Sequence, residues 1–218
     1  MLFAVTVASA QDWANLKRYQ EANGKLSPPA KNEDRVVYMG DSITDFWIGN
    51  DSTFFTSNSY IDRGISGQTT GQMLVRFRQD VIELKPKAVV ILAGINDIAE
   101  NNGPEKIEDI FGNIVSMAQL ARANGIKVVI SSVLPAFALA WRPAINPVPE
   151  VSELNSLLKN YAAVNDIVYL DYFTAMADSR AGLPLEWSKD GVHPNMAGYK
   201  VMEPLAEKAI HDALQRNR

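Results

Sequence analysis

Residues 36–42 read Val-Val-Tyr-Met-Gly-Asp-Ser, an uninterrupted apolar run followed at once by a glycine and two small polar residues. Apolar residues that follow one another, instead of alternating with polar ones, are typical of a strand buried on both faces of a parallel sheet. Four further runs rich in β-branched residues lie at residues 60–61, 88–92, 127–130 and 167–170. The sequence therefore predicts five strands.

Helical patterns separate these strands. Apolar residues recur at helical spacing over residues 70–84 and 104–124, where Pro104 suits the first helical position. A last helix is expected from about Asn195, although Pro204 should kink it or delay its start. Strands that alternate with helices predict an α/β fold. We expect a three-layer α/β/α sandwich whose five parallel strands have the flavodoxin-like order 2-1-3-4-5.

The composition is that of an ordinary globular protein. The 218 residues are 47% hydrophobic and 21% charged, and residues 11–218 are expected to form one domain. The net charge of −4 argues against a nucleic-acid partner, and no apolar run reaches the roughly 18 residues of a membrane span. The chain has no cysteine and only two histidines, His193 and His211. Thiolate chemistry is excluded, and neither a metal ion nor a cofactor is expected.

Residues 1–10 resemble the end of a secretory signal. A short apolar stretch leads into Ala8-Ser9-Ala10, which fits the small-residue rule for signal cleavage. The basic start of such a signal is missing, because Met1 is followed directly by Leu2. We interpret residues 1–10 as a signal-peptide remnant and expect a secreted or periplasmic protein. The alternative is a short strand or a frayed terminus.

Polar residues follow the first, second, third and fifth predicted strands. The four loops are Gly40-Asp41-Ser42, residues 63–67, Gly94-Ile95-Asn96-Asp97 and Asp190-Gly191-Val192-His193-Pro194. Ligands of parallel α/β sheets bind beyond the carboxyl ends of the strands. With the strand order 2-1-3, the first three loops are neighbours at this edge, and the fourth can fold over them.

The residue types in these loops suit acyl transfer. Ser42 lies at a strand-to-helix turn that can present its hydroxyl, and His193 is a candidate base for it. Asp190 precedes His193 by three residues, so that its carboxylate can orient the imidazole and stabilise the imidazolium. The backbone N–H groups of Ser42 and Gly67 and the side-chain amide of Asn96 are candidate donors to an oxyanion. Each motif alone also has a plain structural explanation, as a turn or a helix cap.

In this order, the four segments resemble the four blocks of the SGNH hydrolase superfamily, also called GDSL-type esterases. Residues 63–70 resemble its bacterial branch similar to platelet-activating-factor acetylhydrolases and secreted carbohydrate esterases. The resemblance implies a catalytic triad of Ser42, His193 and Asp190. It carries over Asp41 and Asp97 only as loop-bracing residues. Ile43 stands where the family name expects leucine, and Asp62 stands where relatives often carry asparagine.

The resemblance implies a serine ester hydrolase that forms an acyl-enzyme and needs no cofactor. We expect it to remove short acyl groups, O-acetyl groups of carbohydrates in particular, from a small-molecule or glycan ester. Trp141 and Arg142, in the loop between Pro135 and Pro149, are candidate substrate contacts, since an aromatic platform beside a cation suits a sugar ring. The structural alternative is that Trp141 only packs this loop against the body of the protein and that Arg142 is solvated.

Two other functions remain open. A lysophospholipase or thioesterase would use the same catalytic residues with an apolar acyl groove. A non-catalytic flavodoxin-like module would instead bind a phosphate or flavin at the strand ends, but the chain lacks the glycine-rich phosphate-binding motifs. The oligomeric state is not indicated by the sequence.

Overall fold

A five-stranded parallel sheet forms the centre of the computed structural model, which describes residues 12–216. Its strands are β1 (Val36–Gly40), β2 (Tyr60–Gly64), β3 (Ala88–Leu92), β4 (Lys127–Ser131) and β5 (Val168–Leu170). They are hydrogen-bonded in the order β2-β1-β3-β4-β5, and every pair is parallel. The predicted α/β fold class and strand order are confirmed.

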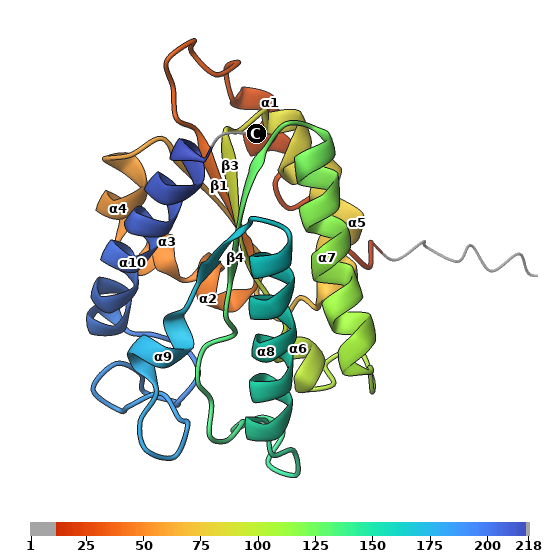
Figure 1. The fold of residues 1–218 in the computed structure, drawn as a ribbon, viewed down its shortest axis with the longest axis vertical. Coiled ribbons are helices and arrows are strands. Elements are labelled where there is room, and N and C mark those ends of the chain that lie inside the picture. The colour runs from red at the N-terminus through yellow and green to blue at the C-terminus, as the bar shows by residue number, and fades with distance from the viewer. Residues whose placement is uncertain (1–11, 217–218) are drawn as a thin grey trace, which may run out of the picture.

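Helices cover both faces of this sheet (Figure 1). One layer holds α1 (Gln20–Lys25), α5 (Thr70–Asp80), α7 (Ile107–Ala123) and α8 (Val148–Val164), and the other holds α3 (Trp47–Asn50), α4 (Ser52–Thr56), α9 (Tyr172–Met176) and α10 (Met196–Gln215). Two short helices, α2 (Ser42–Asp45) and α6 (Ile95–Ile98), start within three residues of the ends of β1 and β3. A 3₁₀ turn, η1 (Ile82–Leu84), follows α5. The buried apolar side chains lie between the sheet and these two layers.

Two helix boundaries differ from the sequence prediction, and the delay expected from Pro204 is absent. The helix predicted over 70–84 is broken at Val81, whose φ of −129° and ψ of −64° are not helical. The helix predicted from Pro104 begins at Ile107, because the preceding Lys106 is extended. The last helix continues through Pro204 without delay. Its start is capped by the Asn195 side chain, which accepts from the N–H of Gly198.

The strand register brings the ends of three strands together. Gly40 at the end of β1 pairs with Gly64 of β2 and with Leu92 of β3. Gly64 must be a glycine, since a Cβ there would lie 2.1 Å from the backbone nitrogen of Asp45 in α2. The close approach seats α2 against β2. Ser42, the first residue of α2, therefore lies beside the loops that follow β2 and β3.

The predicted signal remnant, residues 1–10, lies outside the described residues. Within residues 12–216, no helix is both long and apolar enough to cross a membrane.

Candidate active site

Ser42 occupies the first turn of α2, where the chain leaves β1. The Asp41 side chain caps this helix by accepting from the N–H of Ile43 at 2.9 Å. Only 6% of Ser42 is exposed to solvent, and its Oγ lies 2.8 Å from Nε2 of His193. The two residues are 151 positions apart in the chain, so this contact depends on the tertiary fold.

Asp190 holds the other side of the imidazole. Its Oδ2 lies 2.7 Å from Nδ1 of His193, while its Oδ1 accepts from the N–H groups of Val192 and His193 and from the hydroxyl of Ser188. Partial burial would by itself raise the pKa of Asp190, but the hydrogen bonds from His193 and Val192 outweigh it and lower the pKa to about 2. The carboxylate is thus ionised at neutral pH and can only accept. Nδ1 of His193 must carry a proton, which leaves Nε2 free to accept from Ser42.

The candidate oxyanion donors come from the neighbouring loops. The buried Asn96 amide donates to the carbonyl of Gln68 at 3.1 Å, which places it against the loop that contains Gly67. Gly67 has a φ of +78°, a conformation that favours glycine. Between residues 12 and 216, no acceptor is paired with the backbone N–H of Ser42 or of Gly67. Both N–H groups are therefore available to a ligand.

The two aspartates predicted to brace the loops are buried. Asp97 accepts from both the N–H and the hydroxyl of Thr70, at 2.8 and 2.6 Å, and so ties α6 to the start of α5. Burial raises the pKa of Asp97 to about 7 and that of Asp41 to about 6. In the described part of the chain, no group of three or more His, Asp or Glu side chains is arranged to hold a metal ion.

Two aromatic rings flank His193, and only one of them was predicted. The Trp141 ring lies 6.1 Å from the imidazole and is 39% exposed, and the Phe46 ring lies at 5.3 Å and is 44% exposed. Phe46 follows Ser42 by four residues, and this helical spacing could have identified it. The guanidinium of Arg142 donates to the carbonyls of Ala99 and Glu100, at 3.1 and 3.2 Å, and its part in substrate binding stays a prediction.

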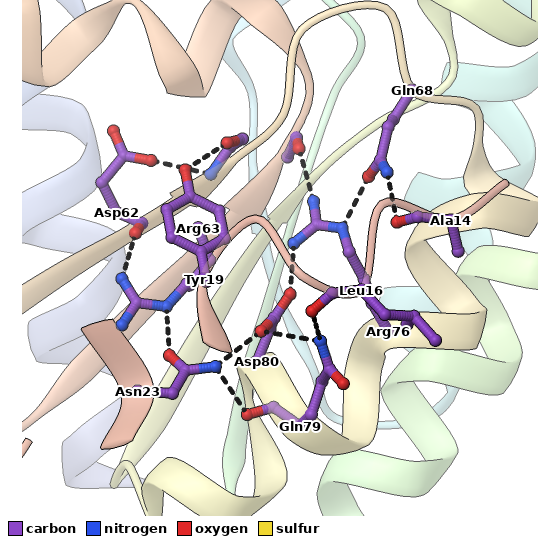
Figure 2. A network of polar contacts seen from close by, with 12 residues as sticks. Ala14, Leu16, Tyr19, Asn23, Asp62, Arg63, Gln68, Arg76, Gln79 and Asp80 are labelled. Atoms are coloured by element: carbon purple, nitrogen blue, oxygen red, sulfur yellow. Dashed lines mark hydrogen bonds and ion pairs between the residues drawn. The ribbon is translucent and has the colours of Figure 1, made fainter. Parts of the chain in front are cut away.

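A buried arginine connects the Ser42 segment with the Gly67 loop. Arg76 of α5 is fully buried and donates to the carbonyl of Gly40 at 3.0 Å and to the side-chain oxygen of Gln68 at 2.6 Å. Its third partner is Asp80, at 3.1 Å (Figure 2). Sequence reasoning missed Arg76, although a charged residue among the apolar residues of an amphipathic helix was a visible signal.

The segment before β1 covers this arginine and its partners. The Gln68 amide donates to the carbonyl of Ala14 at 2.8 Å, and Asn23 donates to Asp80 at 2.7 Å (Figure 2). The Tyr19 hydroxyl donates to the carbonyl of Gly64. Residues 12–25, which the sequence analysis left without a role, therefore close the polar network beneath the site.

Comparisons with known proteins agree with this architecture. The sequence profile of the GDSL-like lipase/acylhydrolase family matches residues 38–201. A proposed acylhydrolase of known structure from Bacteroides fragilis is 51% identical, with a TM-score of 0.91 over 94% of this chain and 100% of that one. A GDSL-like lipase from Bacteroides thetaiotaomicron is 47% identical, with a TM-score of 0.89 over 92% and 98% of the two chains.

Among curated relatives, the esterase TesA of Pseudomonas aeruginosa is 30% identical over 138 residues, which cover 63% of this chain and 62% of TesA. The chain spans between 32% and 62% of the length of the curated relatives that it matches.

Replacing Arg76 is expected to destabilise the protein strongly. The Arg76→Met variant leaves Asp80 as a buried charge without its cation, which costs about 3–5 kcal/mol in free energy of unfolding. Urea denaturation followed by circular dichroism measures this change. Arg78→Met, on an exposed position of the same helix, serves as the control. Equal stability of the two variants would contradict the importance of the buried ion pair.

The Asp62→Asn variant is expected to gain stability over the wild type as the pH rises. Burial raises the pKa of Asp62 to about 7, and within residues 12–216 its Oδ2 has no partner. Folding favours the protonated Asp62 carboxyl. Its contribution to the stability of the wild type is therefore complete below about pH 4 and is lost as the pH rises through about 7. Asparagine cannot ionise and keeps an oxygen for the N–H of Gly64.

The free energy of unfolding of both proteins, measured between about pH 5 and pH 8, should diverge by roughly 1–3 kcal/mol. Parallel pH profiles would show that the Asp62 carboxyl does not titrate abnormally.

Proposed function

The chain belongs to the GDSL-like lipase/acylhydrolase family, and we propose that it hydrolyses carboxylic esters with Ser42 as the nucleophile. The continuous hydrogen-bonded series from Ser42 through His193 to the ionised Asp190 is the observation that carries this proposal. The resemblance noted in four short sequence segments is confirmed at the level of the family.

The proposed reaction has two halves. The Oγ of Ser42 attacks the ester carbonyl carbon while Nε2 of His193 takes the hydroxyl proton, and Asp190 stabilises the imidazolium that forms. Collapse of the tetrahedral intermediate breaks the bond to the alcohol oxygen, which receives the proton from His193. A water molecule activated by His193 then attacks the acyl-enzyme, and the carboxylic acid is released as the Ser42 hydroxyl is restored.

The oxyanion of both tetrahedral intermediates is assigned to the N–H groups of Ser42 and Gly67 and to the Asn96 amide. The two unpaired backbone N–H groups support this assignment, as does the position of Asn96 against the Gly67 loop. Each such donor typically contributes a factor of about 10²–10³ to kcat.

The proposed alcohol site lies between the rings of Phe46 and Trp141, which flank the imidazole that must protonate the alcohol oxygen. A half-exposed indole suits stacking on a sugar ring, so we propose short acyl groups, acetyl in particular, on a carbohydrate alcohol. A lysophospholipase or thioesterase is the second candidate. Three exposed apolar side chains favour this second candidate: Phe46 and Ile48, which follow Ser42 in the chain, and Met196, which follows His193.

Export of the protein and its organisation as one domain over residues 11–218 also remain proposals. They rest on the Ala8-Ser9-Ala10 cleavage pattern and on the continuous series of elements around one sheet.

Ser42→Ala is expected to abolish ester hydrolysis without unfolding the protein. Loss of the nucleophile should reduce kcat for 4-nitrophenyl acetate by several orders of magnitude, on the order of 10⁴ or more, because only binding and the oxyanion donors remain. Circular dichroism checks that the fold is retained. A variant with more than about a tenth of the wild-type kcat/KM would rule out Ser42 as the nucleophile.

Trp141→Ala is expected to raise KM for an acetylated xylo-oligosaccharide more than KM for 4-nitrophenyl acetate, because only the sugar would stack on the ring. Phe137→Ala provides a matched control: Phe137 is an exposed aromatic residue of the same loop, but its ring contacts Arg180.

A panel of 4-nitrophenyl esters from acetate to palmitate separates the two candidate functions. Activity that climbs steadily with chain length would favour the lipid or thioester substrate.

A further inference from the structure

A series of three side chains runs from the surface loop after β4 to the candidate oxyanion site. The indole Nε1 of Trp141 donates to Oδ1 of Asn101 at 3.2 Å, and Nδ2 of Asn101 donates to Oδ1 of Asn96 at 2.8 Å. The Asn101 amide also lies 3.5 Å from the carbonyl of Gly67. Asn101 therefore contacts the donor amide of Asn96 and the loop that supplies the Gly67 N–H.

The indole donor at one end of this series and the Gln68 carbonyl at the other require the same direction for every bond in it. An asparagine amide can be turned over to exchange its oxygen and nitrogen, but an indole N–H can only donate. Trp141 thus requires the oxygen of Asn101, which turns the NH₂ group of Asn101 towards Asn96. Asn96 must then present its own oxygen to Asn101 and its NH₂ group to the opposite side.

The NH₂ group of Asn96 has two hydrogens, and the structure gives a partner to one of them. Nδ2 donates to the carbonyl of Gln68, and no other acceptor between residues 12 and 216 is paired with it. The second N–H is therefore available to an oxyanion. With the amide turned over, a carbonyl oxygen would occupy this position and repel the negative charge instead of stabilising it.

The turn that carries Asn101 is itself held in an uncommon conformation. Glu100 has a φ of +52°, in the left-handed region that non-glycine residues seldom occupy. Arg142, next to Trp141, donates to the carbonyls of Ala99 and Glu100, and the N–H of Asn101 donates to the carbonyl of Asn96. Two adjacent residues of one loop thus fix both the backbone and the side chain of this turn.

We propose that Asn101 is a positioning residue that keeps the Asn96 amide turned towards the oxyanion, and that the indole N–H of Trp141 fixes the orientation of Asn101. This inference rests on the proposed esterase function. It divides the role of Trp141 between two groups: the ring can face the alcohol, while the N–H acts on the rate of the chemical step through two amides.

A double-mutant cycle between Asn101 and Asn96 tests the first half of the proposal. With 4-nitrophenyl acetate, Asn96→Ala should lower kcat about a hundredfold and Asn101→Ala about tenfold, with KM changed less than about threefold. If Asn101 acts through Asn96, the double variant should equal Asn96→Ala within about twofold. Effects that multiply would overturn the proposal, as would an Asn101→Ala variant whose kcat is unchanged.

Trp141→Phe tests the second half, because it removes the N–H and retains a ring. It should lower kcat about fivefold in the wild type and have no further effect in Asn101→Ala. An unchanged kcat, or an equal loss in both backgrounds, would overturn the role of the indole. Asn102→Ala is the matched control, since Asn102 lies in the same turn but donates to Thr69 and Gln72. It should retain wild-type kcat.

The thermal unfolding midpoint of each variant separates loss of fold from loss of positioning. A merely structural role would lower the midpoint and would not depend on the presence of Asn96.

The result with Ser42→Ala separates the esterase proposal from the proposal for Asn101. An active wild type with an inactive Ser42→Ala variant supports the esterase proposal even where the Asn101 cycle fails, and an inactive wild type contradicts the esterase proposal itself.

Discussion

The buried guanidinium of Arg76 is the interaction on which the geometry of the site depends. It binds one backbone carbonyl, that of Gly40, and two side chains, those of Gln68 and Asp80. Gly40 comes two residues before Ser42, and Gln68 directly follows Gly67. A single planar group with fixed donor directions therefore sets the distance between the nucleophile segment and an oxyanion loop. Because Arg76 is buried, each of its partners must be held in place. The segment before β1 contributes to this, since Ala14 and Asn23 contact Gln68 and Asp80.

The fold was predictable from the sequence because its strands are buried on both faces. Five consecutive apolar residues between two helical segments, as in Ala88–Leu92, are typical of a strand covered on both faces, and the loops at the ends of parallel strands then fall at one edge. Ser42, Asp190 and His193 could be proposed for the same reason. Their positions after the strands and the scarcity of histidine carry the information, and the structure places Ser42, His193 and Asp190 within hydrogen-bond distance in series.

Residues that act through other residues could not be predicted in this way. Asn101 resembles any turn asparagine in the sequence, and only its contacts with Asn96 and Trp141 distinguish it. Arg142 was predicted as a substrate contact from its chemical type, and its hydrogen bonds to the backbone of the neighbouring turn had no signal in the sequence. The delay that Pro204 was expected to cause in the last helix is absent for a related reason. Pro204 disfavours a helix locally, but the buried face of α10, which includes Met202, Ala206 and Ile210, packs against the sheet and prevails.

The hydrogen bonds from Arg142 to Ala99 and Glu100 have a consequence for protein engineering. The loop between β4 and α8 is the natural place to graft new sequence when substrate preference is to be altered, since it is long, is exposed over residues 140–144 and lies close to His193. A graft that lacks this arginine would change the substrate preference but would also remove the hydrogen bonds that hold the left-handed turn at Glu100. Loop libraries for this scaffold should therefore hold residues 141 and 142 constant and diversify the positions around them.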